Sequence, residues 1–170
     1  MMQLVEVRDI PSVGEVKDVP TDNLVEIFRM AKEMEALCLK ENGIGLSAVQ
    51  VGIPLKLFVV RINSEKTFGQ KGFICFCNTN YQPIDEAVDI SLEGCLSIRS
   101  PSGQLRHFQV PRYREIALTG YKLDVRGAEL SLQHLQNIVL SGEQSIVFQH
   151  EIDHQNGVLI SEIGKEVFLW

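Results

Sequence analysis

Apolar residues recur every three or four positions in the segment 23–42, which predicts a helix with one apolar face. Asn23 stands three residues before Glu26 and can cap the start of this helix, and Gly43 can end it. We expect the helix to serve mostly as scaffold. Its apolar positions are Leu24, Phe28, Ala31, Met34 and Cys38.

After Gly43 the pattern changes to short runs that are rich in β-branched and aromatic residues, which is typical of strands. Polar segments with turn-forming residues separate these runs. The expected strands are 55–62, 73–77, 115–123 and 128–135, with a turn at 124–127 and exposed loops at 64–72 and 99–109.

A second long helix is predicted to begin near Ser141, where Ser141 and Gln144 match a capping box. Asn156 and Gly157 mark its end. Strands that are mostly segregated from two long helices indicate the α+β class. The 170 residues contain no repeat or linker, which favours a single domain over residues 1–170.

Composition and charge exclude several function classes. Hydrophobic residues make up 45% and charged residues 22%, as in globular proteins. The 16 Lys and Arg against 22 Asp and Glu give a net charge of -6, so we expect neither nucleic-acid nor membrane binding. We find no basic leader and no apolar run of about 18 residues, and therefore expect a cytoplasmic protein with reduced thiols.

The segment His150-Glu151-Ile152-Asp153-His154 lies inside the second predicted helix. Residues four apart share a helical face, so both imidazoles can reach one metal ion, and Glu151 can handle the proton of the attacking water. In the alternative interpretation, the two histidines only make hydrogen bonds. A metal site would need a third protein ligand, for which Glu162, Glu166 and Cys95 are candidates; Cys95 would complete a His₂Cys set.

The other cysteines and one glycine-rich run do not by themselves indicate a functional site. Cys38, Cys75 and Cys77 lie on predicted apolar faces, and we expect them in the core rather than at a metal. The glycine-rich run that begins at Gly43 leads to Gln50, whose amide could donate to a developing oxyanion. By itself this run indicates only a connection between a helix and a strand.

Taken together in this order, Gly-Ile-Gly-Leu-Ser-Ala-Val-Gln, Glu-Gly-Cys-Leu-Ser and Gln-His-Glu-Ile-Asp-His resemble the three motifs of peptide deformylases. The resemblance covers residues 24 to 160 approximately. It implies a hydrolase of the α+β class, with mostly antiparallel strands around a metal-bearing helix. Its reaction would remove the N-formyl group from newly synthesised formyl-methionyl polypeptides and release formate.

The resemblance also implies roles for single residues. Cys95, His150 and His154 would bind one divalent metal ion, expected to be Fe(II) in the cell, with Zn, Ni or Co possible in a purified sample. Glu151 would be the general acid and base, and the Gln50 side chain with the Leu96 backbone N–H would stabilise the oxyanion. The substrate peptide would pair with the backbone near Gly45. Ile44, Ile146 and Val147 would line the methionine pocket.

The chain departs from the family pattern in several places. Ser47 replaces the more usual Ala, Arg99 and Ser100 follow where a proline usually comes first, and the segment before Val110 is lengthened. The first 20 residues or so match poorly. The tail 165–170 is expected to be an added strand or a partner contact, and a contact with the ribosome is left open.

Two rival functions fit parts of the pattern. A different metal-dependent amide hydrolase, such as a protease, would need a wider cleft and activity on internal peptide bonds. A metal-stabilised binding module would need no carboxylate beside the open metal position, so Glu151 favours an enzyme.

Overall fold

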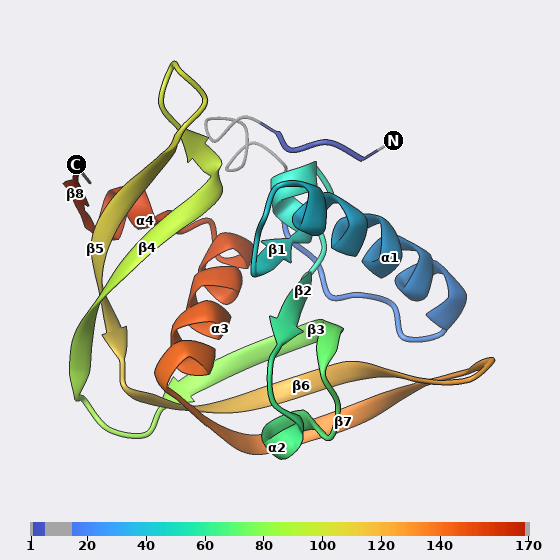
Figure 1. The fold of residues 1–170 in the computed structure, drawn as a ribbon. Coiled ribbons are helices and arrows are strands. Elements are labelled where there is room, and N and C mark those ends of the chain that lie inside the picture. The colour runs from blue at the N-terminus through green and yellow to red at the C-terminus, as the bar shows by residue number, and fades with distance from the viewer. Residues whose placement is uncertain (1, 6–14, 169–170) are drawn as a thin grey trace.

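The structure is a computed structural model that describes residues 2–5 and 15–168. Figure 1 shows the long helix α3 between two antiparallel sheets. One sheet has the strand order β1-β2-β3-β6-β7, and the other has the order β4-β5-β8. The described elements are α1 (Leu24–Lys40), β1 (Gly45–Ser47), η2 (Ala48–Val51), β2 (Leu57–Ile62), α2 (Glu65–Phe68), β3 (Gly72–Pro83), β4 (Val88–Arg99), β5 (Leu105–Tyr113), β6 (Glu115–Arg126), β7 (Glu129–Ser141), α3 (Gly142–Gln155), α4 (Ile160–Ile163) and β8 (Lys165–Val167).

This architecture confirms the α+β class and the mostly antiparallel pairing. The first predicted helix is α1, and the Asn23 side chain accepts a hydrogen bond from the Glu26 backbone N–H at its start, as the pattern predicted. The second predicted helix is α3, which follows Ser141 and ends before Asn156. The Ser141 side chain makes no capping hydrogen bond, so the capping box was wrong: the Gln144 side chain accepts instead from Thr67.

Strand β2 is buried on both faces, which explains its nearly continuous apolar run. Leu57 and Val59 pack with α1, whereas Phe58 and Val60 pack with α3 residues. The sheet therefore separates two apolar layers and fixes the position of α3 relative to α1. Cys38, Cys75 and Cys77 are buried in the layer next to α1, so the prediction that they belong to the core is confirmed.

The prediction of exposed loops at 64–72 and 99–109 was partly wrong. Residues 65–68 form one helical turn, capped by the Ser64 side chain. Residues 105–109 begin β5, and only residues 100–104 form the turn of the β4–β5 hairpin. Phe108 and Val110 face a small core around Ile160, while Gln109 between them is exposed.

The tail prediction is confirmed in part. Residues 165–167 form β8, which pairs with β5, and residues 169–170 lie outside the described part of the chain. The described residues also contain no helix that is long and apolar enough to cross a membrane.

Phe148 joins α3 to the five-stranded sheet. Its ring is fully buried and lies 4.7 Å from the Phe76 ring and 5.5 Å from the Phe58 ring, measured between centroids. Such aromatic pairs stabilise a core beyond the area they bury. The cluster therefore holds the helix that carries His150 and His154 against the sheet.

We predict that Phe148→Ala lowers the free energy of unfolding by about 3–5 kcal/mol, because it removes a large buried ring and leaves a cavity. Phe168→Ala is the control, since Phe168 is 76% exposed and its loss should change stability by less than about 0.5 kcal/mol. Urea unfolding of the parent and both variants gives these values. Equal midpoints for the two variants would contradict the role assigned to Phe148.

Candidate active site

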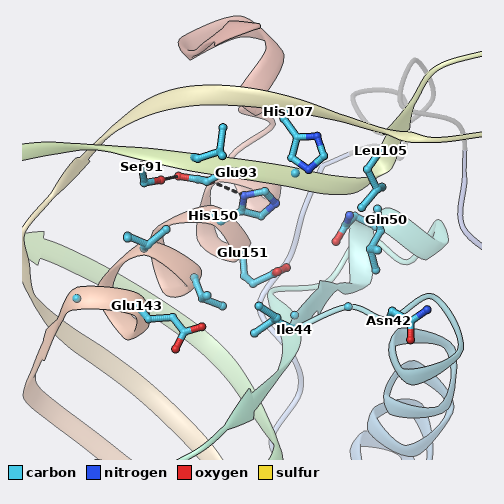
Figure 2. A pocket seen from close by; sticks show the side chains of 18 residues that line it. Asn42, Ile44, Gln50, Ser91, Glu93, Leu105, His107, Glu143, His150 and Glu151 are labelled. Carbon is cyan, nitrogen blue, oxygen red and sulfur yellow. Dashed lines mark hydrogen bonds and ion pairs between the residues drawn. The ribbon is translucent and has the colours of Figure 1, made fainter. Parts of the chain in front are cut away.

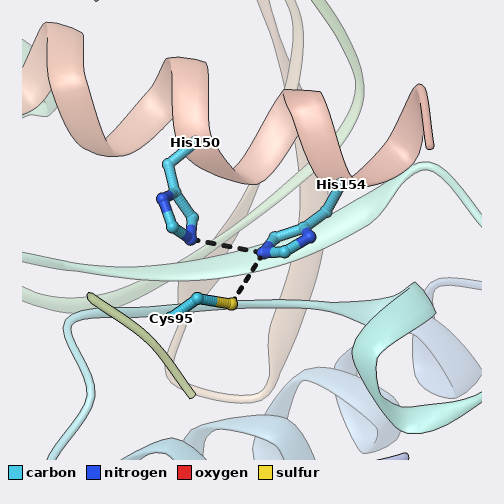
Figure 3. Close-up of side chains that lie close together, drawn as sticks. All are labelled: Cys95, His150 and His154. Carbon is cyan, nitrogen blue, oxygen red and sulfur yellow. Dashed lines mark hydrogen bonds between the residues drawn. The ribbon is translucent and has the colours of Figure 1, made fainter. Parts of the chain in front are cut away.

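Helix α3 carries His150 and His154 on one face, as their spacing predicted. Figure 3 shows the two rings side by side, with their Nε2 atoms 3.2 Å apart. The pKa of His154 lies well below its ordinary value. The main cause is burial, and the charges of His150 and Arg112 lower the pKa further. His154 is therefore a neutral imidazole with a lone pair available as a ligand.

Cys95 lies on the same buried face of β4 as Glu93, which contacts His150 on α3, and β4 becomes irregular at this point. The ladder with β5 is regular as far as the pair of Gly94 with His107, and it resumes at Arg99 with Leu105. Residues 95–98 thus lie opposite Arg106 alone, which is the pattern of a β-bulge. The Cys95 Sγ lies 3.3 Å from the Nε2 of His154, and the donor atoms of all three residues lie within 4.8 Å of one another.

The other candidate third ligands are engaged elsewhere. The Glu162 carboxylate accepts from the Leu159 backbone N–H, and the Glu166 carboxylate pairs with Arg106. Cys95 is therefore the residue that the fold brings to the two histidines. This choice could not be made from the ligand spacing alone.

The cluster of Cys95, His150 and His154 fits a divalent metal ion. Three electron-pair donors converge here in a buried site, so a proton or a cation must lie between them to offset their mutual repulsion. Two imidazoles and one thiolate are a known ligand set for catalytic zinc, which leaves a fourth position for water or substrate. The donor set does not distinguish among the soft to borderline divalent metals.

A buried ionic network orients His150 from behind. The Glu93 carboxylate lies 2.8 Å from the His150 Nδ1 and accepts two hydrogen bonds from Arg112, at 2.7 and 2.9 Å. Arg112 also pairs with Asp153 on α3. Burial alone would raise the pKa of Glu93, but the hydrogen bonds from Arg112 and His150 outweigh it and hold that pKa at about 2. Glu93 therefore stays ionised and directs the His150 Nε2 toward the cluster.

Glu151 lies beside the cluster without belonging to it. Its side chain is buried, and its Oε2 has no hydrogen-bond partner among the described residues. A Cβ at Gly45 would lie only 2.3 Å from the Glu151 Oε1, so the carboxylate packs against a backbone that lacks a side chain. Burial is the main cause that raises the pKa of Glu151 to about 7. A carboxylate with that pKa can both accept and return a proton near neutral pH.

Gln50 approaches the cluster from the five-stranded sheet side. Its Oε1 accepts from the Ser47 backbone N–H at 2.9 Å, which fixes the amide plane. Its Nε2 then points to β4, 3.4 Å from the Cys95 Sγ and 3.1 Å from the Ser97 Oγ. The amide nitrogen of Gln50 is thus held beside the cluster of Cys95, His150 and His154.

A cavity of about 540 Å³ opens in front of these groups (Figure 2). One wall is the segment from Asn42 to Gly45, and the opposite wall is formed by β4 and β5. Strand β1 pairs with β2 on one edge, and no other described strand pairs with it. The cavity is lined by eight of the predicted site residues: Ile44, Gly45, Gln50, Leu96, Ile146, Val147, His150 and Glu151.

Sequence reasoning missed several residues around this cavity. Arg112 and Asp153 were not assigned a role, and Leu105 and His107 lay in the segment predicted to be a loop. The alternation of Phe108 and Val110 could have identified β5. No sequence signal could have identified the partners of Arg112, because they come from β4 and α3.

Comparison with known proteins shows which family the chain resembles. The sequence profile of the polypeptide deformylase family matches residues 4–166, which is wider than the range that the motifs supported. A peptide deformylase from Rhodopirellula baltica is 33% identical, and the match covers 81% of this chain and 61% of that protein. One from Rhizobium meliloti is 32% identical, with 85% and 76% covered.

Solved structures show the same fold. A probable peptide deformylase from Synechococcus phage S-SSM7 is 26% identical, with a TM-score of 0.73 over 96% of this chain and 99% of the phage protein. Peptide deformylase from Thermotoga maritima is also 26% identical, with a TM-score of 0.71 over 96% and 97%. Profile, relatives and fold lead to one conclusion: the chain belongs to the peptide deformylase family, the metal-dependent hydrolases that remove the N-formyl group from new polypeptides.

Proposed function

We propose that this chain catalyses the family reaction in the cavity between α3 and β4. The substrate is the N-formyl group of a formyl-methionyl polypeptide, and the products are formate and a free amine. The observation that carries the proposal is the convergence of Cys95, His150 and His154 next to Glu151 and Gln50. Residues 1–170 would form one catalytic domain.

Each side chain then has a distinct task. A divalent metal held by Cys95, His150 and His154 would supply a Lewis acid that activates water. Glu151 takes the proton of the attacking water and passes it to the departing amine nitrogen. The Gln50 amide and the Leu96 backbone N–H donate to the oxygen of the formyl group as negative charge develops on it.

The cavity walls suit an extended peptide with an apolar first side chain. Ile44, Ile146 and Val147 supply the apolar surface for the methionine. The edge of β1 at Gly45 can pair with the peptide backbone as an added strand. A side chain at Gly45 would collide with Glu151, so this wall must remain bare backbone.

Membership of the family supports a proposal for the metal and for the cellular setting. We propose Fe(II) in the cell, with Zn, Ni or Co in a purified sample. The substrates are nascent peptides, so the place of action is the cytoplasm, and contact with the ribosome would bring the chain to them. The net charge of -6 gives no support for nucleic-acid or membrane binding.

Formate release from formyl-Met-Ala peptides by the metal-loaded protein tests the proposed function. The same peptides with an acetyl group in place of the formyl group are the control. An acetyl group carries a methyl where the formyl group has a hydrogen, so it needs more space in the site. Rapid formate release with little acetate release supports the proposal. Cleavage at internal peptide bonds would favour a protease, and metal binding without any hydrolysis would favour a binding module.

The proton carrier can be tested separately from the metal ligands. We predict that Glu151→Gln keeps the parent's metal content and lowers kcat by about 10²–10⁴-fold, the usual contribution of a general acid and base. Metal analysis and formate assays on one purified batch check both values. Near-normal turnover, or complete loss of the metal, would remove Glu151 from this role.

Cys38 provides a matched control for Cys95, since both thiols are buried. We predict that Cys95→Ala strongly weakens metal binding, whereas Cys38→Ala leaves it unchanged and only costs packing. Burial raises the pKa of the Cys38 thiol to about 12, so it stays protonated and cannot act as a thiolate ligand. Metal content after dialysis decides the matter. Equal content in Cys95→Ala and the parent would place the third ligand elsewhere.

Gln50 tests whether the glycine-rich segment belongs to the active site. We predict that Gln50→Ala lowers kcat by about 10²–10³-fold with little change in KM, because its amide acts mainly in the transition state. Gln50→Glu should be at least as damaging, since it places negative charge beside a developing oxyanion. Steady-state kinetics and a thermal melt distinguish this role from a structural one. A lower Tm with unaltered kcat would show that Gln50 only connects the segments.

A further inference from the structure

One arginine joins the two walls of the cavity at the end next to Leu96. The Arg99 Nε donates to the Leu96 carbonyl oxygen at 3.1 Å, and its Nη1 donates to the Gly103 carbonyl oxygen at 3.0 Å. Its Nη2 donates to the Glu41 carboxylate at 2.9 Å. All three guanidinium nitrogens are therefore engaged, two by the β4–β5 hairpin and one by the end of α1.

These contacts reach both sides of the cavity. Glu41 is the residue at which α1 ends, and the wall from Asn42 to Gly45 follows it directly. Leu96 lies on the opposite wall, and a Cβ at Gly43 would come within 2.8 Å of its side chain. The ion pair between Glu41 and Arg99 thus adds a polar tie where Leu96 already packs against Gly43.

Leu96 needs such a tie because the ladder does not hold it. Residues 95–98 are the four residues of β4 that lie opposite Arg106 alone. A bulged segment lacks the regular cross-strand bonds that fix a strand. The hydrogen bond from Arg99 to the Leu96 carbonyl oxygen supplies a fixed point inside this segment.

We propose that Arg99 is a positioning residue: it ties the bulge of β4 to the end of α1 and so holds the Leu96 backbone N–H at its place in the cavity. This inference rests on the oxyanion role proposed for Leu96. Arg99 itself does not line the cavity.

An ordinary surface ion pair would contribute little, and the same hairpin offers one for comparison. Arg106 pairs with Glu166 through two hydrogen bonds of 2.7 and 2.6 Å. The side chains of this pair are 41% and 30% exposed, against 33% and 25% for Arg99 and Glu41. Arg106→Ala therefore removes an ion pair of similar exposure that does not reach the cavity wall from α1.

The experiment compares Arg99→Ala, Glu41→Gln and Arg106→Ala with the parent, all loaded with zinc. We expect Arg99→Ala to lower kcat for formyl-Met-Ala about tenfold, since small displacements of a catalytic group are costly. KM and metal content should change little, and the shift in Tm should match that of Arg106→Ala. Glu41→Gln should give a smaller loss, and Glu41→Gln with Arg99→Ala together should be no worse than Arg99→Ala alone.

Hydrogen exchange of the Leu96 amide proton, followed by NMR in the same zinc-loaded samples, gives a readout that is independent of activity. We expect exchange to be about fivefold or more faster in Arg99→Ala and unchanged in Arg106→Ala. Equal kcat and equal exchange in these two variants would overturn the inference. If the parent releases no formate, the proposed function fails, while the exchange rates still decide whether Arg99 positions Leu96.

Discussion

The position of α3 between the two sheets is the constraint on which the whole site depends. Cys95 on β4 precedes His150 and His154 on α3 by 55 and 59 residues, so the meeting of the three donors depends on tertiary structure alone. The alternation of buried residues along β4 puts Cys95 on the face turned to α3, and the aromatic packing of Phe148 holds α3 where its two imidazoles lie next to the thiol. The bulge at residues 95–98 breaks this alternation, so Leu96 is buried next to Cys95 and lines the cavity. The proposed metal ligand Cys95 and the proposed oxyanion donor Leu96 are thus consecutive residues of β4.

The charges behind the site balance one another. Glu93 and Asp153 both form ion pairs with Arg112, and the Glu93 carboxylate also contacts the Nδ1 of His150. Loss of one member would leave a buried charge without its partner, which usually costs several kcal/mol. The network therefore joins β4, β5 and α3 at the point where a metal ligand must keep its orientation. Glu151 lies outside this network, and its Oε2 has no hydrogen-bond partner among the described residues, which suits the proton-carrying role proposed for it.

Much of this arrangement could be predicted from the sequence, and the exceptions have physical reasons. The apolar stripe of α1 and the spacing of His150 and His154 are local features, so they predicted the helices correctly and identified two candidate metal ligands. Strand β4 was missed because its pattern is inverted: Ile90 and Leu92 are exposed, whereas Ser91 and Glu93 are buried. Those buried polar groups serve the site, and their burial depends on partners from other elements. The contact between Gln50 and Cys95 was expected only from the family resemblance. Nothing in the glycine-rich run itself indicates that Gln50 lies beside Cys95.

X-ray absorption at the metal edge of the zinc-loaded protein tests the central claim most directly. The convergence of Cys95, His150 and His154 predicts one sulfur at about 2.3 Å and two imidazole nitrogens at about 2.0–2.1 Å from zinc. Cys95→Ala should lose the sulfur contribution, whereas Cys38→Ala should keep it. A parent spectrum with only nitrogen and oxygen neighbours, or a sulfur contribution that survives in Cys95→Ala, would contradict the account.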